Sequence, residues 1–344
     1  MENWKIFKGT RHTHEIEKEK LGDAPNWRKF NGVVPPAEYF LPPENEFERR
    51  YGKNIYADNG VDIVNDDINI DKSIKELVNA ALYLCRPLFI TGKPGSGKSS
   101  LAYAVAHELE LGKVLRWPIT SRSTLLEGLY HYDAIGRLQN TKEGELPNIS
   151  QYLRLGPLGT ALVPRSKPRV LLIDEIDKSD INLPNDLLNI FEEGEFYIPE
   201  IGRLSQNKVQ LLTNDSNQTI ELEFANTEQG YIRCHEFPFI IMTSNEEKEF
   251  PPAFLRRCLR ITTQVPSSDD LSNIVTAHLG QETLDKAKEI FNHFEKQNKA
   301  KEGNLATDQL LNAIYLVSRG ADLSIDEDDK KNLLNALLRP LLND

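Results

Sequence analysis

The amino-acid sequence predicts an α/β fold with a parallel sheet, β-hairpin insertions and a small all-helical domain after them. Three observations support this prediction. A glycine-rich segment at residues 92–99 stands between an apolar run and a helical pattern. A second apolar run ends in two carboxylates at 174–175, and helical spacing dominates from residue 266 onward. Strands that alternate with helices are typical of parallel sheets in α/β proteins.

The glycine-rich segment fits the pattern G-x-x-x-x-G-K-[ST]. In such a loop, backbone N–H groups surround phosphate oxygens, the lysine reaches the β- and γ-phosphates, and the hydroxyl is a ligand of Mg²⁺. A strand pattern at 87–90 precedes it and a helical pattern at 100–109 follows, so the phosphates would lie at a helix N-terminus. The predicted nucleotide-binding residues are Gly92, Lys93, Pro94, Gly95, Ser96, Gly97, Lys98, Ser99 and Ser100.

Composition narrows the class of protein. The chain has 344 residues, of which 39% are hydrophobic and 27% charged, as in soluble globular proteins. No apolar run approaches the roughly 20 residues that span a bilayer, and the N-terminus has no signal-peptide core. The 3 cysteines are too widely spaced for a disulfide framework or a zinc site, so we expect a cytoplasmic protein. A net charge of −11 disfavours nucleic acid as a partner unless a local basic channel exists.

Three regions follow one another along the chain. Residues 1–70 carry paired prolines and many charges with little periodicity, which indicates an irregular N-terminal extension. From residue 71 a helical pattern leads into the strand before the phosphate loop, and we assign 71–265 to the α/β nucleotide-binding domain. Residues 266–344 form the helical domain, with helices expected near 268–279, 282–299, 306–319 and 326–342.

The apolar run at 169–173 predicts a buried strand that ends at Asp174 and Glu175. The carboxyl ends of parallel strands share one edge of a sheet, so both carboxylates should lie beside the phosphate loop. Asp174 would bind Mg²⁺ through water, and Glu175 would orient or deprotonate the attacking water. A strand at 237–245 should bring Asn245 to the same edge, to hold that water or contact the γ-phosphate.

Two segments interrupt this α/β pattern. Residues 120–168 are too long for a plain connection between strands. After a helix expected at 183–193, alternating apolar and polar residues predict short strands and a β-hairpin insertion near 196–233. Farther on, Arg256 and Arg257 follow a short apolar segment. They are either solvated ion-pair partners or an arginine finger that reaches a neighbouring subunit's γ-phosphate.

This order of motifs resembles that of the AAA+ ATPases, over about residues 71–340. The segment 125–159 looks like the helix-2 insertion of the MoxR-like branch, and the strands between 195 and 236 look like its pre-sensor hairpin. The resemblance implies a P-loop NTPase core followed by a helical lid. It implies that Lys98 and Ser99 bind phosphate and Mg²⁺, that Asp174 is a metal residue, and that Glu175 is the catalytic base. It further implies that Asn245 is sensor 1 and that Arg257, with Arg256 as its competitor, is the arginine finger.

One residue of the family pattern is missing. The arginine that such proteins carry at the start of the third lid helix is absent, because residues 306–309 read Ala-Thr-Asp-Gln. Only Arg319 and Arg339 are weak substitutes for it. The phosphate loop reads no base, so GTP stays open beside ATP, the usual nucleotide of the superfamily.

AAA+ proteins similar to this chain assemble as rings, usually hexamers, with ATP at each subunit interface. MoxR-like members act with partner proteins, often ones with a von Willebrand factor A domain, in complex maturation, stress or phage defence. We therefore expect a remodeller of a client protein, with Tyr130 and Tyr132 either gripping it or packing within the ring. A nucleic-acid motor that uses Arg165, Lys167 and Arg169, and a nucleotide-dependent assembly switch, are the alternatives.

Overall fold

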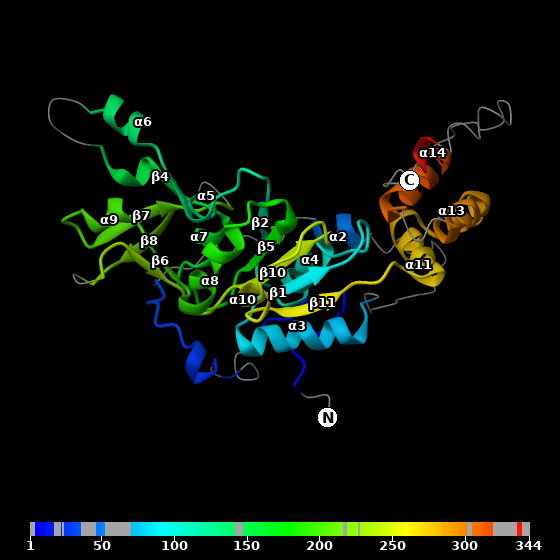
Figure 1. Ribbon diagram of the computed structural model, residues 1–344, viewed down its shortest axis with the longest axis horizontal. Helices are drawn as coiled ribbons and strands as arrows, with labels where there is room; N and C mark the ends of the chain where they lie inside the picture. The colour runs from blue at the N-terminus through cyan, green and yellow to red at the C-terminus, as the bar shows by residue number, and fades with distance from the viewer. Residues whose placement is uncertain are drawn as a thin grey trace.

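The computed structural model describes residues 4–16, 22, 24–35, 46–51, 70–141, 147–215, 219–225, 228–300, 305–318 and 336–338. Figure 1 shows the central sheet in the middle, a second β region on the left and the helices after Pro266 on the right. Within the described residues, no helix combines the length and the hydropathy that a bilayer span requires. The expected last helix at 326–342 falls almost entirely outside the described residues, as do Arg319 and Arg339.

The central sheet contains five parallel strands in the order β11-β1-β10-β5-β2. Its inner strands β5 and β10 are buried along their whole length, as expected for a sheet covered on both faces. The predicted α/β fold with a parallel sheet is therefore confirmed. The strands are β1 (Leu88–Thr91), β2 (Leu115–Pro118), β5 (Val170–Asp174), β10 (Phe239–Ser244) and β11 (Leu259–Thr262).

Strand register brings the polar strand ends together. Thr91 at the end of β1 pairs with Ser244 of β10, and Met242 of β10 pairs with Ile173 of β5. The residues that follow these strands therefore meet at one edge of the sheet. Helices cover the sheet on both faces (Figure 1). They include α3 (Lys72–Leu84), α4 (Ser100–Glu108), α7 (Pro157–Ala161), α8 (Leu183–Glu193) and α10 (Pro252–Leu255).

The two segments that interrupt the α/β pattern join in a second sheet, which the sequence did not predict. Its order is β3-β4-β7-β8, and the parallel pairing of Arg154 with Leu212 connects the first segment to the hairpin. Its strands are β3 (Tyr130–Tyr132), β4 (Leu153–Leu155), β7 (Lys208–Leu212) and β8 (Thr219–Glu223). A separate pair, β6 (Glu195–Tyr197) and β9 (Tyr231–Arg233), closes the base of the hairpin. Short helices complete this region, namely α5 (Leu125–Leu129), α6 (Ala134–Gln139), η2 (Ile149–Gln151) and α9 (Pro199–Gly202), whereas η3 (Ile176–Lys178) directly follows β5 of the central sheet.

A buried ion pair ties the hairpin to the central sheet. Arg169 directly precedes β5, and its Nη1 lies 2.8 Å from Oδ2 of Asp215, which follows the hairpin strand β7 by three residues. The side chain of Arg169 is 0% exposed and that of Asp215 is 6% exposed. Arg169 also donates from Nη2 to the backbone oxygen of Lys113. Burial raises the pKa of Asp215, but the charges of Arg169 and Arg165 outweigh burial and hold it below its ordinary value.

The described N-terminal residues wrap over α3 and α4. Asn79 of α3 accepts the N–H groups of Ile6 and Phe7 at Oδ1, over 2.6 and 2.9 Å. Glu108 at the end of α4 accepts three backbone N–H groups, from residues 8, 9 and 10. Two short helices, η1 (Asn26–Arg28) and α2 (Glu46–Tyr51), are the only regular elements described before residue 70. Buried polar side chains thus anchor an irregular segment whose backbone has few partners of its own.

Four described helices follow β11 and pack into a core of their own. They are α11 (Ser268–Leu279), α12 (Gln281–Lys286), α13 (Lys288–Ala300) and α14 (Thr307–Ser318). The single helix expected at 282–299 is wrong, because a turn at Ala287 divides it into α12 and α13. Leu284, Ile290 and Phe294 all face the same core on either side of this turn. The apolar spacing therefore continues across the turn at Ala287, so the sequence pattern does not reveal that the helix ends there.

Candidate functional site

The phosphate loop runs from the end of β1 to the start of α4, and its three glycines adopt backbone angles that other residues avoid. The φ values of Gly92, Gly95 and Gly97 are 144°, 77° and 81°. Glycine reaches this region without the steric penalty of a Cβ. A Cβ built on Gly95 would lie only 2.9 Å from the Cβ of Ala306 in the helical domain. The loop is curled as a phosphate cradle requires, and the helical domain packs directly on it.

Lys98 is a nearly buried cation inside this loop, with 7% of the residue exposed. Its Nζ donates to the backbone oxygens of Gly92 and Lys93, over 2.6 and 2.8 Å. Burial lowers the pKa of Lys98. Four surrounding carboxylates act in the opposite direction and raise this pKa: Asp177, Asp174, Glu175 and Glu246. Negative charge therefore gathers beside the cradle, and an anionic phosphate needs cations there to offset it.

The carboxylate of Asp174, at the end of β5, receives four hydrogen bonds. Ser99 Oγ and Thr243 Oγ1 donate to its Oδ1, over 2.7 and 2.9 Å. Arg116 of β2 donates to its Oδ2 through Nη2 and Nε, over 2.7 and 3.2 Å. Burial raises the pKa of Asp174, but these hydrogen bonds outweigh burial and hold the pKa below its ordinary value. Asp174 is therefore ionised at neutral pH.

Ser99 and Asp174 fit a magnesium site. Mg²⁺ takes oxygen ligands, and proteins usually supply only one or two of them while water and phosphate provide the rest. The serine hydroxyl and the carboxylate lie 2.7 Å apart beside the phosphate cradle. Among the described residues, no group of three or more His, Cys, Asp or Glu side chains could hold a metal by itself. This donor set suits a metal that shares its coordination with a nucleotide.

Glu175 follows Asp174 with a left-handed backbone, at φ 61° and ψ 50°. Such a conformation is uncommon for a residue with a side chain, and it is found disproportionately at functional sites. The N–H of Glu175 donates to Thr243 Oγ1 over 2.9 Å, so one hydroxyl fixes both neighbouring acidic residues. Oε2 of Glu175 lies 2.9 Å from Nζ of Lys178. The carboxylate is 45% exposed and stands at the same sheet edge as the phosphate loop.

Asn245 directly follows β10 and reaches the predicted edge of the sheet. Its backbone N–H donates to Oδ2 of Asp177 over 2.9 Å, and the N–H of Glu247 donates to the same oxygen over 3.3 Å. Asp177 is 1% exposed, and its other oxygen, Oδ1, has no hydrogen-bond partner among the residues that the structure describes. A buried carboxylate thus connects the turn after β5 to the loop that carries Asn245.

Arg256 and Arg257 lie at the opposite edge of the sheet from the phosphate loop. The next strand, β11, runs parallel to β1, with Leu259 opposite Leu88, so both strands begin at the edge where the arginines stand. Four residues of strand separate the two edges, which is about 13 Å. Arg257 is paired through Nε with Glu192, at 2.6 Å, whereas Arg256 is exposed. The two arginines therefore lie far from the phosphate loop of their own chain.

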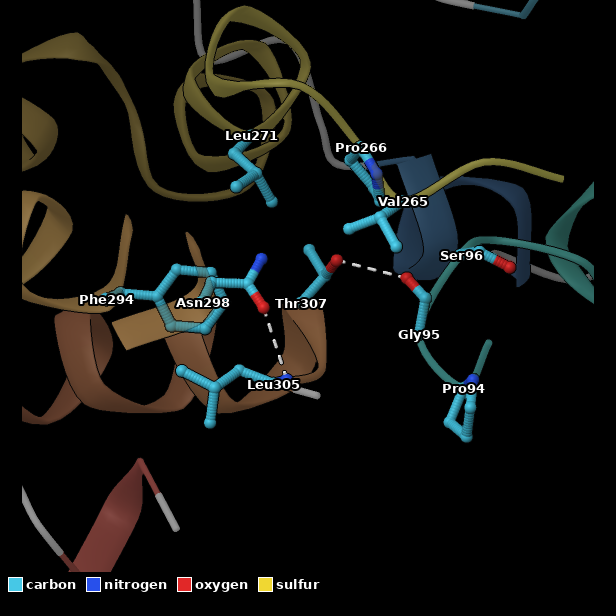
Figure 2. Close-up of a pocket in the computed structure, with 10 residues that line it drawn as sticks. All are labelled: Pro94, Gly95, Ser96, Val265, Pro266, Leu271, Phe294, Asn298, Leu305 and Thr307. Atoms are coloured by element: carbon cyan, nitrogen blue, oxygen red, sulfur yellow. Dashed lines mark hydrogen bonds between the residues drawn. The ribbon is translucent and has the colours of Figure 1, made fainter. Parts of the chain in front are cut away.

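A small pocket lies between the phosphate loop and the helical domain (Figure 2). Thr307, at the start of α14, donates from Oγ1 to the backbone oxygen of Gly95 over 3.0 Å and closes one side. Thr307 thus occupies the region where the sequence lacks the expected arginine. The wall opposite the loop is mostly apolar and includes Val265, Pro266, Leu271, Phe294 and Leu305. Leu271, Phe294 and Leu305 belong to the packed core of the helical domain, and the space in front of them holds about one water molecule, so it is too small for a nucleotide base.

The basic residues of the nucleic-acid alternative are engaged inside the chain. Arg165 and Arg169 are 4% and 1% exposed. Lys167 forms an ion pair with Glu15 at 2.6 Å. Of the two tyrosines, Tyr130 is 9% exposed and donates from its hydroxyl to Oε2 of Glu200 over 3.1 Å. Packing therefore accounts for Tyr130, and these three cations offer no open basic channel.

Sequence reasoning missed three residues at the site, namely Arg116, Thr243 and Asp177. Arg116 and Thr243 lie inside strand patterns, where a polar residue among apolar ones was the only available signal. Asp177 comes two residues after Glu175, and its burial was the feature that the sequence did not show. Each acts on Asp174 or Asn245 across neighbouring strands or turns, which local sequence patterns do not reveal.

Comparison with known proteins agrees with this geometry. Residues 87–258, half of the 344-residue chain, match a family model described as the AAA domain of the dynein-related subfamily. None of the curated proteins compared with the chain matches it. The matched range contains the phosphate loop, Asp174, Asn245 and the arginine pair. The chain therefore belongs to the dynein-related subfamily of AAA domains and is an AAA+ ATPase.

Proposed function

We propose that this protein is a ring-forming, Mg²⁺-dependent ATPase that uses hydrolysis at its subunit interfaces to remodel a partner protein. The observation that carries the proposal is the cluster at the carboxyl edge of the sheet. There, Ser99 Oγ lies 2.7 Å from Asp174, beside a phosphate cradle, and Glu175 is the next residue. Metal donors and a candidate base thus stand where a γ-phosphate would be held.

Each residue of the cluster has a proposed role. The nucleotide phosphates bind the loop, with Lys98 as the cation that reaches them. Ser99 and Asp174 hold Mg²⁺, which neutralises charge on the β- and γ-phosphates when it is bound. Glu175 takes a proton from the attacking water, and Asn245 orients that water. Thr243 and Asp177 keep these two residues in register.

The position of the arginine pair supports action in trans. Because Arg256 and Arg257 stand at the sheet edge opposite their own phosphate loop, they act only on the nucleotide of an adjacent subunit. A closed ring places every such edge against a neighbour, and a hexamer is the usual ring of this superfamily. In the described chain Glu192 holds Arg257 by an ion pair. Arg257 is the preferred finger and Arg256 the competitor because the ending Leu-Arg-Arg-Cys at 255–258 is similar to finger motifs of the superfamily, and the ion pair with Glu192 must open for Arg257 to act.

The second sheet supports the MoxR-like reading and a protein client. Hairpin β7–β8 and the segment that carries α6 form one β unit, which lies at the opposite end of the molecule from the helical lid (Figure 1). Exposed apolar residues stand on α6, where Ile135 and Leu138 are 72% and 71% exposed. Such residues suit contact with another protein. A partner with a von Willebrand factor A domain is the kind that the MoxR-like reading predicts.

The roles at the nucleotide site are tested by paired substitutions. Lys98→Ala should abolish nucleotide binding, whereas Lys208→Ala, which removes the same charge from an exposed position on the hairpin, should retain it. Glu175→Gln should bind nucleotide normally and lose roughly 10²- to 10⁴-fold in turnover. Glu246→Gln, which removes a neighbouring carboxylate, should keep most of the turnover. Equal turnover in Glu175→Gln and the unmodified protein would remove Glu175 from the base role.

Assembly is tested by measuring the ATPase rate per subunit over a wide protein concentration range, with the mass followed by light scattering. The rate should rise as the ring forms. Arg257→Ala should keep nucleotide affinity and lose roughly 10³- to 10⁵-fold in turnover. Mixing Arg257→Ala subunits with Glu175→Gln subunits should restore part of the activity, because some interfaces then combine an intact base with an intact finger. A monomer that turns over ATP as fast as the assembly would contradict the trans assignment.

A further inference from the structure

The carboxylate of Asp174 is fully used by groups of its own chain. Oδ1 accepts from Ser99 and Thr243, and Oδ2 accepts twice from Arg116. A carboxylate offers about four lone-pair positions, so these hydrogen bonds saturate it. Mg²⁺ held by Ser99 and Asp174 needs an oxygen of this carboxylate, either directly or through a bound water. One of the existing partners must therefore release Asp174.

Arg116 is the partner that can move. Ser99 and Thr243 have short side chains fixed by the phosphate loop and by the inner strand β10, whereas Arg116 has a long side chain on β2, the edge strand of the described sheet. The side chain of Arg116 is 51% exposed, and that of Asp174 is 9% exposed. A guanidinium at this position can rotate into solvent without a change in the backbone, so its release from Asp174 requires no rearrangement of the sheet.

Charge balance gives Arg116 a reason to be there. Asp177, Asp174, Glu175 and Glu246 surround Lys98, and of these four carboxylates Glu175 is also paired with Lys178. Arg116 supplies a further positive charge, placed on Asp174, the carboxylate that Ser99 contacts. The divalent cation would supply the same compensation from the other side of Asp174. Arginine and metal are thus alternative partners for one carboxylate.

We propose that Arg116 is a positioning residue that competes with Mg²⁺ for Asp174 and so sets the concentration of Mg²⁺ at which the site becomes competent. The proposal rests on the proposed nucleotide site and adds a control over its metal step. While Arg116 holds Asp174, the carboxylate keeps its place but its Oδ2 is blocked. When the metal and nucleotide bind, Arg116 leaves Oδ2 for solvent. A ligand that favours one of two arrangements shifts the equilibrium only by its differential affinity for them.

The test measures nucleotide affinity, not turnover. A fluorescent ADP derivative is titrated into the full-length protein by anisotropy, first in EDTA and then over a range of free Mg²⁺. In Arg116→Gln, the half-saturating Mg²⁺ concentration should fall about three- to tenfold, because the competing cation is gone. Affinity in EDTA should fall, since Asp174 then repels the phosphates unscreened. Arg122→Gln, which removes an exposed arginine from the segment after β2, should leave both values unchanged.

The outcomes separate this inference from the proposed function. If the unmodified protein does not bind the nucleotide, or if Mg²⁺ does not tighten that binding, the proposed function fails. If Mg²⁺ tightens binding but Arg116→Gln leaves the half-saturating concentration unchanged, only the role of Arg116 is overturned. An equal loss of affinity with and without Mg²⁺ would make Arg116 a phosphate ligand instead. Arg116→Lys keeps the charge but lacks the planar pair of donors of a guanidinium. Its half-saturating Mg²⁺ concentration should therefore lie between those of the unmodified protein and Arg116→Gln.

Discussion

Replacing Asp215 with asparagine should lower the free energy of unfolding by roughly 3 to 5 kcal/mol, the loss expected when one partner of a buried ion pair is removed. The pair is short, at 2.8 Å, and its side chains are 0% and 6% exposed. Arg165, which also acts on Asp215, is 4% exposed. The asparagine variant therefore leaves two buried cations without the carboxylate that faces them. For a domain of this size the loss corresponds to a fall in melting temperature of roughly 6 to 20 °C.

The assay is thermal unfolding followed by circular dichroism at pH 7, with a second ion pair on the same hairpin as the control. Lys208 and Glu223 lie 3.3 Å apart on strands β7 and β8, but their side chains are 57% and 60% exposed. Glu223→Gln should change the free energy of unfolding by about 1 kcal/mol or less. A double variant, Arg169→Met with Asp215→Leu, should regain part of the stability, because the buried ion pair is then replaced by apolar side chains and Arg165 is the charge that remains beside them.

The pH dependence supplies an independent check. The folded-state pKa of Asp215 lies below its ordinary value of about 3.9, because the arginines outweigh the effect of burial. The contribution of Asp215 to the free energy of unfolding is therefore complete at pH values above its ordinary pKa. It is lost as the pH falls through the lower pKa of the folded state. The difference in the free energy of unfolding between the unmodified protein and Asp215→Asn should stay constant from about pH 5 to 8 and become smaller at lower pH. Equal melting temperatures for Asp215→Asn and Glu223→Gln would refute the reasoning.

Three further substitutions test the site and the N-terminal segment. Thr243→Val removes the hydroxyl shared by Asp174 and Glu175, so turnover should fall roughly 10- to 100-fold while nucleotide affinity stays unchanged. Thr243→Ser should restore turnover, and a failure to restore it would contradict the hydrogen-bond role. Gly95→Ala should lower the melting temperature more than Gly97→Ala, because both glycines have positive φ but only Gly95 has a close neighbour, Ala306. Equal losses in the two variants would argue against the packing of the helical domain on Gly95. Asn79→Ala should speed amide hydrogen exchange at residues 6 and 7, which Asn79 holds, and unchanged protection there would show that other contacts fix the segment.

Most of the nucleotide-binding half could be predicted from sequence because its signals are local. The phosphate loop, the strand before Asp174 and the helix at 183–193 each carry an apolar pattern of the right length, and the structure has that helix at Leu183–Glu193. The rule that parallel strands end at one edge was enough to place Ser99 beside Asp174. The roles of Lys98, Glu175 and the arginine pair remain predictions.

What the sequence missed depends on contacts between distant segments. Strand β11 has only four residues with alternating exposure, and a pattern this short does not predict a strand by itself. The joining of the insertion to the hairpin rests on the pairing of Arg154 with Leu212, 58 positions away, which no local period encodes. The bond from Arg116 to Asp174 likewise connects neighbouring strands at a separation of 58.

The N-terminal segment also gives the helical lid a second point of attachment. Besides the bond from Thr307 to Gly95 before α4, His278 of α11 makes a hydrogen bond of 3.2 Å to the backbone oxygen of Arg50 in α2. Helix α2 in turn lies against α4, where Phe47 stacks on His107 at 3.8 Å. A body held at two separate points can turn only about the line that joins them. Lid motion that preserves both hydrogen bonds is therefore a rotation about one axis, and one end of that axis lies at Gly95 in the phosphate loop.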